Sequence, residues 1–84
     1  MHEVALAQSI LDIATETARK NKAKRIIGIR LRIGKLSCVN LDSLQFAFSC
    51  ISSDTLAEGA ELSASTIRES QTLEIESIEV DLTK

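Results

Sequence analysis

The first three residues of the chain, Met1, His2 and Glu3, carry the atoms with the clearest metal chemistry in the sequence, and His2 is its single histidine. The Met1 amine, the amide nitrogen between Met1 and His2, and Nδ1 of His2 can close two fused chelate rings around one ion, and Glu3 can supply a fourth donor. Planar, nitrogen-rich donor sets suit Cu(II) and Ni(II) better than Zn(II), Mg(II) or Ca(II). Because that amide must lose its proton, we expect the affinity to rise with pH.

These donor atoms alone leave two interpretations open. Any chain whose second residue is histidine offers the same nitrogens, so the spacing also fits an exposed His2 without a function. Donor type does not separate the two candidate metals either, because Cu(II) binds such a set more tightly than Ni(II) and would compete in vitro. Whether His2 is a metal ligand or an exposed residue without a function therefore has to be decided from the rest of the sequence.

Catalytic chemistry has little support in this composition. The chain has one histidine and three glycines, so it offers no nucleophile beside a base and no glycine-rich phosphate loop. Cys38 and Cys50 lie twelve positions apart and form neither a CxxC motif nor the disulfide framework of a small secreted domain. We interpret both as small, buried or half-buried apolar side chains. The sequence predicts a protein that is not an enzyme.

Length and composition indicate one small domain. With 84 residues, 44% of them hydrophobic, no Trp or Tyr and two Phe, the chain should fold around a small aliphatic core. No window approaches 18 apolar residues, and the early carboxylates of Glu3 and Asp12 do not fit a secretory signal, so we expect a cytoplasmic protein without a membrane contact. A net charge of −2 predicts no affinity for nucleic acid.

Two segments have the periodicity of amphipathic helices. Residues 3–20 begin with Glu3 and end with basic residues, which complements a helix dipole. The second helix, over residues 41–51, has two candidate N-caps at its start, Asn40 and Asp42. The predicted apolar faces consist of Val4, Leu6, Ala7, Ile10, Leu11, Ile13, Ala14 and Ala18 in the first helix, and of Leu44, Ala47, Phe48 and Ile51 in the second.

Three other segments alternate as strands do. Residues 25–34 place Ile27, Ile29, Leu31 and Ile33 on one parity, and residues 60–67 place Leu62, Ala64 and Thr66 on one parity. In residues 73–82 the apolar parity changes between Ile75 and Ile78, which a regular strand cannot accommodate on one face. A β-bulge at Glu76 or Ser77 would restore the facing.

These elements predict an α+β domain of order αβαββ, with two helices packed on one face of a small three-stranded mixed sheet. The short polar joint at residues 68–71 favours an antiparallel hairpin between the last two strands. We further expect the last strand to lie between the other two, because its acidic residues could then oppose the arginines of the first strand. The residues concerned are Arg30, Arg32, Glu74, Glu79 and Asp81.

Four stretches of the chain resemble, in order, successive blocks of the HypA/HybF family of nickel metallochaperones for NiFe hydrogenase maturation. They are MHEVALAQSILDIA, AKRIIGIRLRIGKLSCV, LQFAFSCIS with DTLAEGAEL, and LEIESIEVD. The resemblance implies that Met1 (through its amine), His2 and Glu3 bind Ni(II). It also implies a carrier that acts with the GTPase HypB and passes nickel to the large subunit of NiFe hydrogenase.

The chain departs from this family at one place. The family carries a zinc domain built on two CxxC pairs between the second and third strands, whereas this chain has STIRESQTL there. Cys38 and Cys50 cannot replace it, because a structural zinc site needs four closely spaced ligands. We therefore predict a single nickel-binding domain over residues 1–84, with a short turn near residues 67–72 and no zinc.

Two further questions stay open at this point. A weak strand with an exposed edge allows either a monomer or a strand-swapped dimer. The alternative function to nickel delivery is a metal-independent docking module of the maturation complex, in which His2 is idle.

Overall fold

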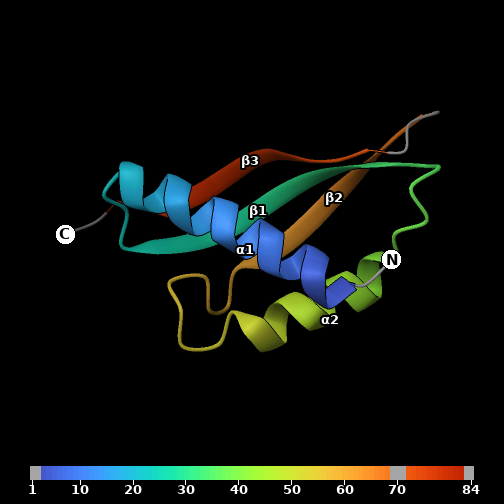
Figure 1. The fold of residues 1–84 in the computed structure, drawn as a ribbon. Coiled ribbons are helices and arrows are strands. Elements are labelled where there is room, and N and C mark those ends of the chain that lie inside the picture. Colours follow the sequence, from blue (N-terminus) through green and yellow to red (C-terminus); the bar gives the residue numbers. More distant parts are fainter. Residues whose placement is uncertain (1–2, 69–71, 83–84) are drawn as a thin grey trace.

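The computed structural model describes residues 3–68 and 72–82 and shows an α+β domain. Figure 1 shows two helices on one face of a three-stranded sheet, whose other face is open, so the predicted fold class and element order are confirmed. Within the described residues no helix is long and apolar enough to cross a membrane. The elements are α1 (Glu3–Lys20), β1 (Arg25–Gly34), α2 (Leu41–Ile51), β2 (Glu61–Ile67) and β3 (Leu73–Asp81).

The strand order is β2-β1-β3, with β1 parallel to β2 and antiparallel to β3. The predicted central position of the last strand and its hairpin with the preceding strand are therefore wrong. The cause is the β1–α2–β2 unit, in which a helix crosses over between two parallel strands and places β2 directly beside β1. β3 then pairs with the other edge of β1, where Arg32 opposes Glu74 and forms an ion pair of 3.9 Å.

The predicted bulge in the last strand is confirmed. Arg30 pairs with Ser77 while Leu31 pairs with Ile75, so Glu76 is the extra residue. This insertion changes the facing of the second half of β3. Its four apolar residues consequently all pack against the core: Leu73, Ile75, Ile78 and Val80.

A second bulge lies in β1 and was not predicted. Ile26 pairs with Val80 and Gly28 pairs with Glu79, which leaves Ile27 without a partner on β3. The extra residue reverses the facing at this end of the strand. Ile26 is therefore fully buried and Ile27 is 43% exposed, so the expectation that Ile27 points inward is wrong.

The end of the sheet where β1 and β2 finish and β3 begins extends beyond both helices (Figure 1). Leu62 of β2 is buried and Ala64 is half-buried, but Thr66, which was predicted to face inward, is exposed. Burial along β2 thus decreases toward the end that the helices do not cover.

Helix α1 packs through alanines together with the larger side chains of Ile10 and Leu11, which are also buried. Ala7, Ala14 and Ala18 are fully buried, which allows close approach of the helix to its neighbours. Val4 and Ile13 belong to the predicted apolar face but are 61% and 54% exposed, because that face is wider than the surface against which α1 packs.

Helix α2 follows its prediction closely. The Asn40 side chain is the N-cap and accepts a hydrogen bond of 3.0 Å from the Ser43 amide, which selects Asn40 over Asp42. The predicted inner face is confirmed, since Leu44, Ala47 and Phe48 are buried and Ile51 is half-buried.

The β1 bulge can be tested with a matched pair of truncations. Ile26→Ala should lower the free energy of unfolding by about 2–5 kcal/mol, because it leaves a cavity in the core. Ile27→Ala should lower it by about 1 kcal/mol or less, because its side chain already contacts solvent. Urea denaturation followed by circular dichroism measures both, and equal losses would contradict the bulge.

Candidate metal centre

The predicted donors are contiguous with the first turn of α1. Met1 and His2 lie outside the described residues, and Glu3 is half-buried and is the first residue of the helix. The start of a helix carries partial positive charge, which stabilises the Glu3 carboxylate and opposes a bare cation. Anionic donors would offset this unfavourable effect on a metal, and a carboxylate together with a deprotonated amide would provide them.

The first turn of α1 is held to the rest of the domain by Ala7 and not by Val4. Ala7 is fully buried and Leu6 is half-buried, whereas Val4 is largely exposed. We expected Val4 and Leu6 to pack inward together, and this is wrong for Val4. The start of the helix therefore has a fixed position while its side chains remain open to an incoming molecule.

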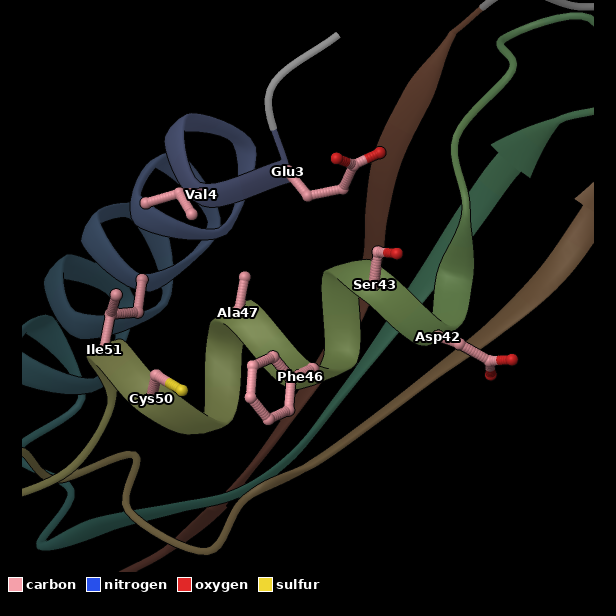
Figure 2. Close-up of a pocket in the computed structure, with 8 residues that line it drawn as sticks. All are labelled: Glu3, Val4, Asp42, Ser43, Phe46, Ala47, Cys50 and Ile51. Atoms are coloured by element: carbon pink, nitrogen blue, oxygen red, sulfur yellow. The ribbon is translucent and has the colours of Figure 1, made fainter.

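An apolar cleft of about 620 Å³ separates the start of α1 from the outer face of α2 (Figure 2). The Glu3 side chain extends toward the first turn of α2, where Asp42 and Ser43 lie, and Phe46 and Cys50 occupy successive turns of α2. Phe46 is 71% exposed, although it is one of the two aromatic residues of the chain. The lining residues are Glu3, Val4, Asp42, Ser43, Phe46, Ala47, Cys50 and Ile51.

Sequence reasoning did not find this cleft. The available signal was Phe46, which lies outside the predicted inner face of its helix. A helix with apolar residues on more than one face either is surrounded by the rest of its own domain or contacts another molecule. Exposure of Phe46 here shows that no other part of the described chain covers it.

The two cysteines do not form a second metal centre in residues 3–68 and 72–82. That part of the chain contains no group of three or more His, Cys, Asp or Glu side chains that could hold an ion. Cys38 and Cys50 are both free and exposed, so the expectation of buried or half-buried thiols is wrong. Cys38 lies in the β1–α2 loop at a positive φ of 60°, and Cys50 lines the cleft beside Phe46.

Comparison with known proteins gives consistent matches. The family profile described as "Hydrogenase/urease nickel incorporation, metallochaperone, hypA" matches residues 1–82. The hydrogenase maturation factor HypA of Chlorobaculum parvum is 47% identical over 62 residues, which are 74% of this chain and 55% of that protein. The HypA of Escherichia coli is 42% identical over 62 residues, 74% of this chain and 53% of that protein. The chain thus spans about half the length of the curated relatives it matches.

The fold agrees with solved structures. The solution structure of the Ni metallochaperone HypA from Helicobacter pylori superimposes with a TM-score of 0.83 at 17% identity, covering 99% of this chain and 100% of that one. A second solution structure of a HypA protein gives a TM-score of 0.80. The αβαββ fold of this chain is therefore the fold of these HypA structures. The chain belongs to the HypA family, and the resemblance seen in its sequence is confirmed.

The exposure of both thiols generates a direct test. In the folded protein, Cys38 and Cys50 should both react with Ellman's reagent at rates close to that of a small free thiol, because neither is shielded. Absorbance of the released thiolate should report two equivalents per chain before any denaturant is added. Reaction of one or both thiols only after unfolding would contradict the structure.

Proposed function

We propose that this chain is a nickel metallochaperone that binds Ni(II) as cargo at its amino terminus and delivers it during NiFe hydrogenase maturation. The observation that carries the proposal is the family match, which begins at residue 1 and so includes the MHE donor set. As a carrier, the protein is not an enzyme, and we place its action in the cytoplasm.

The proposed site consists of the Met1 amine, the amide and imidazole nitrogens of His2, and Glu3. A deprotonated amide and a carboxylate together neutralise the two charges of Ni(II), which removes the conflict with the positive end of the α1 dipole. The planar nitrogen-rich set prefers Ni(II) or Cu(II) to harder cations. Because Val4, beside Glu3 in the first turn of α1, is exposed, an acceptor can approach this end of the helix from solvent.

The proposed partners are the large subunit of NiFe hydrogenase and the GTPase HypB. Support comes from the relatives, which are named hydrogenase maturation factors. The cleft beside Glu3 supplies apolar contact surface next to the donors. The sequence left two oligomeric states open, a monomer and a strand-swapped dimer. Chemical crosslinking of the purified protein tests whether it is a monomer or a dimer.

We also propose that the chain is a single nickel-binding domain without structural zinc. β2 ends at Ile67 and β3 begins at Leu73, so residues 68–72 alone join them, and this joint contains no cysteine. Two CxxC pairs, the zinc ligands expected for the family, therefore have no counterpart at this position. Metal analysis of protein purified without chelators should find zinc well below one equivalent per chain.

Nickel titration tests the donor set. The wild-type protein should bind about one Ni(II) per chain with a visible absorption band of planar nickel. His2→Ala should weaken binding by about a hundredfold or more, because loss of an outer contact to a metal ligand alone costs 10- to 100-fold. Residues added ahead of Met1 should weaken it similarly, because they convert the amine to an amide.

Glu16→Gln is the matched control for this titration. It removes an exposed carboxylate from α1 several turns away from the donors and should leave nickel affinity unchanged. Equal nickel affinity in the extended protein and in the wild type would show that the amine is not a ligand.

A second candidate function, metal-independent docking within the maturation complex, is favoured by the exposed Phe46 cleft. The acidic residues Glu3 and Asp42 line this cleft, so its occupant should be an apolar side chain flanked by Lys or Arg. Phe46→Ser should weaken capture of HypB or the large subunit by about thirtyfold, a loss typical of a central interface aromatic.

Leu82→Ser, at another exposed apolar residue, is the control for this capture and should have no effect. Nickel affinity should be unchanged in Phe46→Ser. If His2→Ala leaves capture intact while Phe46→Ser abolishes it, docking does not require the metal. Full capture by Phe46→Ser would exclude the cleft as the docking surface.

A further inference from the structure

β3 forms an open edge of the sheet. Among the described strands it pairs with β1 alone, and Figure 1 shows it along one side of the sheet. Its residues on the helix side of the sheet, Leu73, Ile75, Ile78 and Val80, pack against the core and yet remain only half-buried. The equivalent residues of the central strand, Ile29 and Leu31 among them, are fully buried. The helix layer therefore stops short of covering β3.

An apolar groove of about 420 Å³ runs between α1 and β3. It is separate from the cleft beside Glu3, because the two share no lining residue. Ile13 lies on its α1 side and is 54% exposed. Aliphatic side chains from α1, the β1–α2 loop and β3 line the groove, among them Ile13 and Ile75, together with the hydroxyl of Ser37.

One wall of the groove contains a buried hydroxyl without a partner. Ser37 is 8% exposed, and within the described residues its Oγ makes no hydrogen bond. Its backbone N–H is satisfied, since it donates to the Gly34 carbonyl at 3.0 Å. Buried hydroxyls in folded proteins are nearly always bonded, because an unpaired one loses its hydration without compensation. The Ser37 Oγ can bond a polar group of a molecule that enters the groove.

The charge of β3 identifies the kind of molecule. The strand carries Glu74, Glu76, Glu79 and Asp81 and no Lys or Arg. Pairing with β3 of a second copy would bring glutamates together across the new ladder, which is unfavourable. A strand with Lys or Arg on its solvent side would instead place cations opposite these carboxylates. The edge therefore favours a basic segment of another protein over a second copy of this chain.

We propose that the free edge of β3 accepts an extended, basic peptide segment of a partner protein as a fourth strand. The backbone of the segment continues the hydrogen-bonded ladder, as in other cases of strand addition to a sheet edge. Its alternate apolar side chains enter the groove against Ile13 and Ile75. Its Lys or Arg side chains face Glu79 and Glu74 on the open face of the sheet, and Glu74 is shared with Arg32 of β1. This surface requires no nickel and does not rest on the nickel-carrier function.

The test uses the full chain labelled with ¹⁵N and a heptapeptide of alternating lysine and valine, KVKVKVK. Amide shifts should change along β3 and at the groove residues of α1, and exchange of β3 amides with solvent should slow. The peptide EVEVEVE, with the opposite charge, and KKKKVVV, with the same composition but no alternation, should each bind about tenfold more weakly or worse.

Charge reversal and groove variants complete the test. Glu74→Lys combined with Glu79→Lys should invert the preference, so that EVEVEVE binds about tenfold more tightly than KVKVKVK. Ile13→Ser should weaken KVKVKVK binding, whereas Leu36→Ser, at an exposed residue that lines neither this groove nor the cleft beside Glu3, should not. His2→Ala should bind KVKVKVK as the wild type does.

Three results would overturn the proposal. One is equal binding of KKKKVVV and KVKVKVK, which would reduce the effect to net charge. Another is a shift map centred away from β3, for example on β2, the other edge of the sheet. The third is sedimentation showing a dimer that is abolished by Glu79→Pro, a strand-breaking change in β3, which would mean that a second copy occupies this edge.

Discussion

Both edges of β1 are hydrogen-bonded, and this double pairing places every other element of the domain. Parallel pairing with β2 requires a crossover connection, and α2 is that connection. Antiparallel pairing with β3 uses the remaining edge of β1 and leaves β3 open on its far side. α1 then packs beside α2 over the same face of the sheet through Ala7, Ala14 and Ala18, which brings its first turn next to the first turns of α2.

The position of α1 connects the fold to the proposed chemistry. The alanines are fully buried, so the start of the helix is held by packing, while Val4 and the Glu3 side chain remain accessible. A carrier needs this combination, because a donor set buried in the core could not release its metal to an acceptor. The helix dipole adds a smaller effect: it disfavours a cation at this end of α1 by about 1 kcal/mol or less, and anionic donors offset this cost. Deprotonation of the first amide provides one of them and makes binding sensitive to pH.

Much of the fold and of the candidate site could be predicted from the sequence, namely the features that the local residue pattern determines. The bounds of both helices follow from periodicity, and the donor atoms at the chain start follow from residue type. The sequence narrowed the cap to Asn40 or Asp42 and the bulge to Glu76 or Ser77, and the structure selects Asn40 and Glu76. The strand order could not be predicted, because charge pairing between β1 and β3 fits both the predicted and the observed order. The facing of Ile26 and Ile27 was missed because the sequence gives no sign of the bulge in β1. The apolar residues from Ile27 to Ile33 alternate as they would in a regular strand. The cleft at Phe46 depends on how far α1 extends over α2, which is a tertiary property.

The central claim is that the chain start and the first turn of α1 hold the nickel. Stepwise addition of Ni(II) to ¹⁵N-labelled protein, followed by backbone amide spectra, tests it most directly. A planar, diamagnetic complex at Met1, His2 and Glu3 predicts sharp signals throughout, with shifts concentrated on the first turn of α1 and little change beyond Ala7. Shifts or broadening centred on Cys38, on Cys50 or on the acidic strand β3 would contradict it.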